Sequence, residues 1–164
     1  MFKKGDFVVN SNNGICEIAD IVTMNMSGAD KEYYQLVPIN EPTAKVYIPV
    51  DTASTRIRHA MNKDDAWKLI ESITQIDEAY IENEKEREKT YKDAINSRDP
   101  KRLVGIIKTL YLRKQDRLEA GKKNTAVDER YFKLAENQLH SELAFALQVE
   151  KIKVEQIILN HITN

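Results

Sequence analysis

The chain of 164 residues has one cysteine and no long apolar run. Because Cys16 is the only cysteine, no disulfide can form within the chain, and a reducing cytoplasm is the expected setting. No run of apolar residues approaches the roughly 20 that a membrane-spanning helix needs. The first residues, MFKKGDFVV, contain no apolar signal-peptide region, so we expect no secretory signal.

Common catalytic and metal-binding motifs are also missing. The sequence has no P-loop motif, no GxGxxG and no GxSxG. His59, His140 and His161 are scattered singly, and no HxxxH or CxxC spacing offers zinc ligands. A buried structural thiol is the expected role of Cys16. We therefore predict that the protein is not an enzyme and needs no cofactor or metal; the alternative is an enzyme whose catalytic groups are distant in sequence.

The first fifty residues have the pattern of short β-strands. Segments rich in β-branched residues at 6–9, 14–26, 31–39 and 44–50 are separated by turn signals, of which Asn13-Gly14 is the strongest and 27–30 the next. Pro38 and Pro49 are expected at strand ends, edges or bulges. Short strands at close spacing with no helix between them predict a small antiparallel β-barrel or a strongly bent sheet.

After Asp51 the pattern becomes helical. Asn62 is expected to cap a helix over 62–73, and Asp99-Pro100 is expected to begin a second helix. Thr125 is expected to cap a third helix, with Asp128 at the third position of that helix as in a capping box. A last short helix is expected at 152–162. The prediction is an α+β protein in which a barrel domain, residues 1–55, precedes a bundle of four or five helices, residues 56–164, whose first helix at 62–74 is partly linker.

The most uneven distribution of charge lies between Lys101 and Lys123. This segment holds eight basic and two acidic residues, a local charge of +6, in a chain whose formal total is −1. One interpretation is a solvated basic face at the end of a helix. The other is a patch that neutralises phosphates, which would give affinity and salt dependence with little base readout.

Several segments resemble one known family. FKKGDFVVNSNNGICEI at 2–18, KEYYQL at 31–36 and VYIPVDTA at 46–53 are similar to the opening of the CarD/CdnL family of bacterial transcription regulators, a module shared with transcription-repair coupling factor. TAVDERYFKLAENQLHSELAFAL at 125–147 is similar to the second half of the same family. The resemblance therefore covers almost the whole chain, with its segments in the family's order.

The resemblance implies a partner for each half. A Tudor-like barrel would bind the β subunit of bacterial RNA polymerase, and the helical domain would lie on promoter DNA at the upstream edge of the transcription bubble and stabilise the open complex. The protein would then be cytoplasmic and reach the nucleoid through polymerase. Basic residues that touch polymerase in some relatives fall here at Met24 and Tyr47, and Lys45 is a third candidate. A monomer is expected, although an exposed sheet edge permits strand exchange or dimers.

In several family members a tryptophan wedges into the DNA beside the bubble. Two alignments place either Tyr80 or Glu84 at that position, and we prefer Tyr80, whose alternative role is that of a core aromatic. The other expected DNA contacts are basic: Lys85, Arg87, Lys89, Arg113, Lys114, Lys122 and Lys123. The alternative function is a protein-only adaptor that binds another protein through Leu112 and the charged helices.

Overall fold

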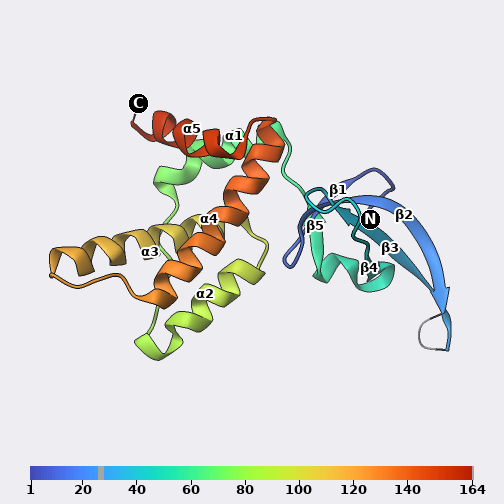
Figure 1. The fold of residues 1–164 in the computed structure, drawn as a ribbon, viewed down its shortest axis with the longest axis horizontal. Helices are drawn as coiled ribbons and strands as arrows, with labels where there is room; N and C mark the ends of the chain where they lie inside the picture. The colour runs from blue at the N-terminus through green and yellow to red at the C-terminus, as the bar shows by residue number, and fades with distance from the viewer. Residues whose placement is uncertain (26–27, 164) are drawn as a thin grey trace. The chain divides into compact units, whose positions relative to one another are not determined.

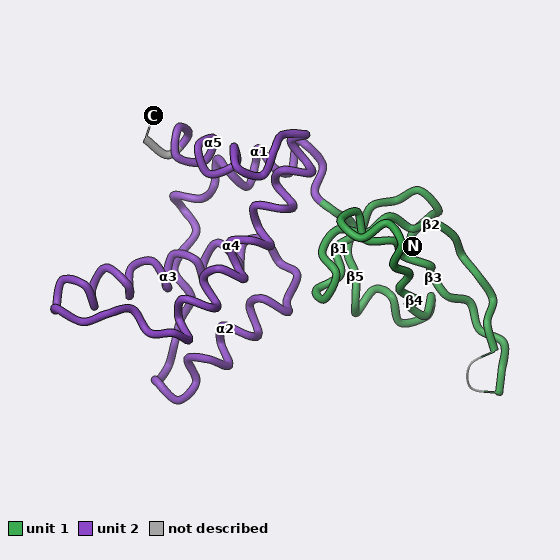
Figure 2. The backbone as a smooth tube through the Cα atoms, in the orientation of Figure 1, with its two compact units in different colours: residues 1–60 green, residues 61–164 purple. Residues whose placement is uncertain are grey.

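The computed structural model describes residues 1–25 and 28–163. The expected end of the second strand at residue 26 and the first residue of the expected turn at 27–30 lie outside the described residues. The chain divides into two compact units, residues 1–60 and residues 61–164 (Figure 2). We call them the sheet unit and the helical unit and describe each by itself.

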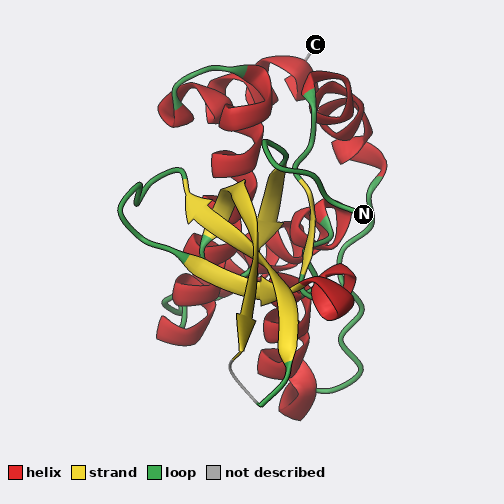
Figure 3. Cartoon of the chain, turned by 90° about the vertical axis from the view of Figure 1, so that its right-hand side faces the viewer, coloured by secondary structure: helices red, strands yellow, loops and turns green. Residues whose placement is uncertain are grey.

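The sheet unit is a five-stranded antiparallel sheet. Its strands are β1 (Phe7–Asn10), β2 (Gly14–Asn25), β3 (Asp30–Pro38), β4 (Val46–Pro49) and β5 (Ile57–His59), and their order in the sheet is β4-β3-β2-β1-β5 (Figures 1 and 3). The predicted antiparallel sheet before a set of helices is confirmed. The sheet does not close, however, because β4 and β5 form its two ends, so the expected barrel is an open sheet.

One face of this sheet carries its core. The fully buried side chains include Val8, Cys16, Ile18, Leu36 and Ile48. A bulge in β2 between Ile18 and Asp20 shifts the register by one residue, as bulges do in bent sheets. Pro38 and Pro49 are the last residues of β3 and β4, where the missing N–H of proline does least harm to the ladder.

The sheet unit extends further along the chain than the expected boundary at residue 55. A 3₁₀ helix, η1 (Val50–Thr55), leads into β5, which pairs with β1 through Val8–His59 and Asn10–Ile57. Ile57 is buried in the sheet core. The three residues of β5 therefore belong to the sheet unit, which ends at Ala60.

The described part of the helical unit, residues 61–163, contains five α-helices and two short 3₁₀ helices. They are α1 (Lys63–Ser72), η2 (Ile73–Gln75), η3 (Glu84–Glu86), α2 (Arg87–Asn96), α3 (Pro100–Glu119), α4 (Ala126–Leu147) and α5 (Lys151–Thr163). The three predicted helix starts are confirmed, since the side chains of Asn62, Asp99 and Thr125 each accept a hydrogen bond from a backbone N–H in the first turn. No described helix has both the length and the apolar character required to cross a membrane.

Buried apolar side chains from all five α-helices form a single core in this unit. Leu69, Tyr91, Ile106, Leu143 and Val154 are examples, one from each helix. Two polar side chains that carry the family resemblance, Asp128 and Glu142, are also buried. The Glu142 carboxylate accepts the N–H of Met61 at 2.7 Å, and so fixes the residue with which the helical unit begins.

Candidate nucleic-acid interface

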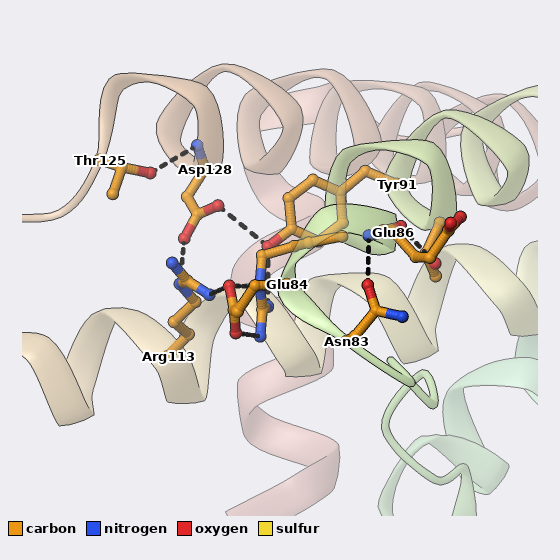
Figure 4. Close-up of polar contacts among 9 residues, drawn as sticks. Asn83, Glu84, Glu86, Tyr91, Arg113, Thr125 and Asp128 are labelled. Carbon is orange, nitrogen blue, oxygen red and sulfur yellow. Dashed lines mark hydrogen bonds and ion pairs between the residues drawn. The ribbon is translucent and has the colours of Figure 1, made fainter.

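A closed network of polar side chains joins η3, α2, α3 and α4 (Figure 4). The Tyr91 hydroxyl donates to Asp128 Oδ1 at 2.9 Å, and Arg87 donates to the Tyr91 oxygen at 3.0 Å. Arg87 also donates two hydrogen bonds of 2.9 Å to the Glu84 carboxylate. Arg113 closes the ring, donating to Glu84 at 3.0 Å while its Nε lies 2.8 Å from Asp128 Oδ2 as an ion pair without hydrogen-bond geometry. We call these five residues the polar network.

Burial explains why the network takes this form. The Asp128 side chain is only 3% exposed, and a buried carboxylate is tolerated when it is paired with a cation and hydrogen-bonded. Arg87 and Arg113 lower the pKa of Glu84 from 4.5 to about 2 through hydrogen bonds and charge. The hydrogen bond to Glu84 raises the pKa of Arg87, while burial raises that of Tyr91. Glu84, Arg87 and Tyr91 thus each keep one protonation state near neutral pH.

The network changes the interpretation of two expected DNA contacts. Arg87 and Arg113 carry two positive charges, and Glu84 and Asp128 carry two negative charges, so the sum within the network is zero. The guanidinium groups are turned toward these carboxylates, and their side chains are only 18% and 23% exposed. The structure therefore places both arginines in the framework of the helical unit.

Asp128 also departs from the expected capping box. Its backbone N–H donates to the Thr125 hydroxyl at 3.0 Å, as expected of the third helical residue. The carboxylate, however, is turned toward Tyr91 and Arg113 (Figure 4). The helix start was correct and the reciprocal half of the box was wrong, because burial beside two partners on other helices outweighs a local contact.

The lysines have a different environment from the arginines. Lys122 and Lys123 are exposed in the turn after α3, whereas Lys114 lies half-buried at 4.0 Å from Glu129. The turn is well fixed, since Gly121 adopts a positive φ of 76° and the N–H groups of Gly121 and Lys122 bond to the carbonyls of Leu118 and Arg117. Two exposed ammonium groups thus project from a rigid helix end.

Lys85 and Lys89 form a second pair of exposed cations, one in η3 and one in α2. The nearby acids are numerous, and Glu84 and Glu88 already pair with Arg87 and Lys92. This part of the surface is therefore mixed in charge, unlike the lysine-rich end of α3.

Tyr80 lies on the surface of the helical unit. Its side chain is 83% exposed in the loop between η2 and η3, so its alternative role as a core aromatic is wrong. With Thr90, Lys101 and Arg102 it lines a hollow of about 320 Å³, which Asp77 and Glu78 also border. Of the two residues aligned with the family's tryptophan, Tyr80 is free to meet a partner's surface and Glu84 is bound to two arginines.

The hollow reveals two further cations that were not among the expected contacts. Lys101 and Arg102 are exposed in the first turn of α3, and they line the same hollow as Tyr80 although they are about twenty residues away in sequence. The basic segment that contains them was recognisable in the sequence. Their proximity to Tyr80 was not, because it depends on how the loop at 76–83 folds back on α3.

The candidate polymerase contacts lie in the sheet unit. Tyr47 is 38% exposed on the edge strand β4, and Lys45 is exposed just before it. The register aligns Tyr47 with Gln35 and Asp20, and Met24 lies four residues further along β2 on the same face. Met24 and Tyr47 therefore share a face of the sheet but are separated by roughly 13 Å along the strands, at about 3.3 Å per residue.

The other reactive side chains of the described residues do not gather into a metal site. Cys16 is fully buried, and burial raises the pKa of its thiol to about 11. The His59 ring packs on Phe2 with centroids 4.7 Å apart, and burial lowers the pKa of His140. Within residues 1–25 and 28–163, no three His, Cys, Asp or Glu side chains form a group suited to a metal ion.

Comparison with protein families gives one match for each unit. The model of the CarD-like/TRCF RID domain matches residues 2–61, and the model of the CarD C-terminal domain matches residues 68–159. A search of curated proteins finds no match. The two matches follow the order of the sheet unit and the helical unit and together span nearly the whole chain. The chain therefore belongs to the CarD-like family of transcription regulators, whose members interact with RNA polymerase.

Proposed function

We propose that this protein is a non-enzymatic bacterial regulator of transcription initiation. The sheet unit binds the β subunit of RNA polymerase, and the helical unit holds promoter DNA at the upstream edge of the bubble, so that the open complex is stabilised. The protein then acts in the cytoplasm, on the nucleoid, without a cofactor. The observation that carries this proposal is the pair of family matches, one for each unit, in a single chain.

On the DNA side, the contacts are made by side chains that lie outside the polar network, most of them exposed. Tyr80 supplies an aromatic surface against a distorted base step, as apolar wedges do in the minor groove. Lys122 and Lys123, with Lys85, Lys89 and Lys114 as further cations, supply charge for the phosphates. We assign Arg87 and Arg113 to the stability of the helical unit, because their charges are satisfied within the polar network.

Attachment to polymerase explains how a chain of net charge −1 works on DNA. Binding through the sheet unit makes the DNA contact intramolecular, so the effective concentration of promoter reaches the millimolar range typical of short linkers. A few phosphate contacts are then sufficient, and a strongly basic protein is unnecessary.

The decay of open complexes tests the DNA contact. Purified polymerase is allowed to open one promoter with this protein present, a competitor is added, and the fraction of open complex is followed with time. Tyr80→Ala is expected to shorten the lifetime, because the exposed ring is lost without any effect on the core. Tyr111→Ala is the matched control, since Tyr111 is an exposed tyrosine on α3 that is 53% accessible. Equal lifetimes for wild type and Tyr80→Ala would contradict the role of Tyr80.

Capture by the isolated β-subunit lobe tests the polymerase contact. The double variant Met24→Ala, Tyr47→Ala is expected to lose binding, since aromatic and methionine side chains contribute strongly to protein interfaces. Lys45→Ala alone is expected to weaken it less. Ile39→Ala is the control, because Ile39 is 40% exposed in the loop after β3 and is not among the proposed contacts. Undiminished capture of the double variant would remove this face of the sheet from the interface.

A second candidate function is a protein-only adaptor. Leu112 and Leu118 are apolar residues 42% and 50% exposed on α3, and such residues suit a protein partner better than a phosphate backbone. A footprint of polymerase on a promoter, with and without this protein, distinguishes the two functions. Extended protection upstream of the bubble supports the DNA contact, whereas an unchanged footprint supports the adaptor.

A further inference from the structure

The segment that carries Tyr80 is bound to α3 by three residues on one face of that helix. The first is Lys108, whose ammonium group donates hydrogen bonds to the carbonyl oxygens of Ile73 and, at 2.6 Å, Ile76. Ile73 begins η2 and Ile76 directly follows it, and the Ile73 carbonyl also accepts the Ile76 N–H at 3.3 Å. A cation of the basic segment is thus turned inward and holds the loop.

The second contact is the hydroxyl of Thr109. The N–H of Ala79, the residue before Tyr80, points between the Thr109 hydroxyl at 2.9 Å and the Gly105 carbonyl at 3.4 Å. The same hydroxyl donates to the Gly105 carbonyl at 2.9 Å. Thr109 is buried, so water does not compete readily for these bonds.

The third contact is made at Gly105, where the lack of a side chain lets the loop backbone lie close to α3. A Cβ placed there would lie 3.0 Å from the Asp77 carbonyl oxygen and 3.7 Å from the Ala79 nitrogen. Both of these atoms belong to backbone, which cannot rotate away as a flexible side chain can. Gly105 therefore forms a notch in α3 that the backbone of 77–79 occupies.

We propose that Gly105, Lys108 and Thr109 are positioning residues, which fix the place from which Tyr80 meets promoter DNA. The inference rests on the proposed function, in which Tyr80 contacts the DNA. Lys101 and Arg102 lie on α3 one turn before Gly105 and line the hollow beside Tyr80. An aromatic ring held beside two cations suits one nucleotide, with its base against the ring and its phosphate on the cations, away from Asp77 and Glu78.

Fixing the loop matters because Tyr80 itself is almost wholly exposed. A ring on a mobile loop must lose conformational freedom when it binds, and that loss weakens the contact. The notch removes this freedom beforehand, at the residue directly before Tyr80. How strongly the exposed ring contacts DNA therefore depends on three buried or half-buried residues of α3.

A double-mutant cycle on open-complex lifetime tests the inference with the full chain. Thr109→Val keeps the shape of the side chain and removes the hydroxyl, and it is combined with Tyr80→Ala. We expect Thr109→Val to shorten the lifetime about threefold when Tyr80 is present and to have little further effect when it is absent, because coupled residues are not additive. Amide hydrogen exchange should become faster at Ala79 in Thr109→Val while the core of the helical unit stays protected.

Ser72→Ala is the matched control, because the half-buried Ser72 hydroxyl donates to the Leu69 carbonyl within α1 and does not line the hollow beside Tyr80. It should leave both lifetime and Ala79 exchange unchanged. If Thr109→Val shortens the lifetime equally with and without Tyr80, or not at all, positioning by α3 is overturned while the DNA contact stands. If Tyr80→Ala alone has no effect, the proposed role of Tyr80 fails, and the inference fails with it.

Discussion

Two groups of cations in the helical unit lie in opposite environments. Arg87 and Arg113 lie in the polar network, where Glu84 and Asp128 balance their charge. Lys122 and Lys123 project from the rigid turn after α3. All four were expected to touch DNA, because each belongs to a locally charged stretch of sequence. The comparison teaches that a cation contributes to binding only when no carboxylate from another element has already paired with it.

The largest expected effect comes from breaking the network at its buried member. Asp128→Ala should lower the free energy of unfolding by about 3 kcal/mol, because it leaves Arg113 without its buried partner and Tyr91 without its acceptor. Urea denaturation followed by far-ultraviolet circular dichroism measures the change. Glu129→Ala is the control, since it removes a neighbouring carboxylate that is far more exposed. Equal losses in the two variants would show that the network is not a special source of stability.

Reversing the charge of the two turn lysines should affect DNA contact and leave stability unchanged. Lys122→Glu with Lys123→Glu is expected to weaken the effect on open complexes about tenfold and to make the salt dependence shallower, since roughly 0.9 counterion is released per phosphate contact. Stability should be unchanged. Lys68→Glu with Lys153→Glu is the matched control, because it reverses two exposed lysines on α1 and α5. If the Lys122→Glu, Lys123→Glu variant lost stability, or if both double variants lost activity equally, the distinction between network arginines and turn lysines would be wrong.

The smallest expected effect is a change with pH at Glu84. Its pKa is lowered to about 2 in the folded protein from 4.5, so its ionised form stabilises the fold above pH 4.5, and this stabilisation is lost as the pH falls toward 2. The difference in unfolding free energy between wild type and Glu84→Gln should therefore be complete near pH 6 and shrink between about pH 4.5 and pH 2. Denaturation at several pH values measures it. A difference that does not vary with pH would mean that Glu84 acts through packing and not through its charge.

Local signals in the sequence were sufficient for the helix starts. Asn62, Asp99 and Thr125 each cap the helix they were expected to cap, because a cap depends on residues three or fewer positions away. The strands with β-branched residues and the turn at Asn13-Gly14 also formed as expected. In these cases the local preference and the three-dimensional structure agree.

Features that depend on distant partners were missed. The strand β5 has three residues and exists because it pairs with β1, about fifty residues earlier in the chain. The Arg113 guanidinium is held by Glu84, 29 residues away, and the Lys108 ammonium by a carbonyl 35 residues away. No spacing rule finds such pairs in one sequence. The sequence therefore indicated which residue types to consider for the candidate site, but not the contacts that pair some of them within the fold.

Each unit contains one natural reporter: Cys16 is buried in the sheet unit, and Trp67 lies in the helical unit. With a pKa near 11, roughly one thiol in a thousand is ionised at pH 8, and the sheet core covers it, so alkylating reagents react only when that core opens. The single tryptophan, Trp67, packs against the core of the helical unit, and its fluorescence follows that unit. Thiol labelling and indole emission thus report separately on the two halves of one unmodified chain.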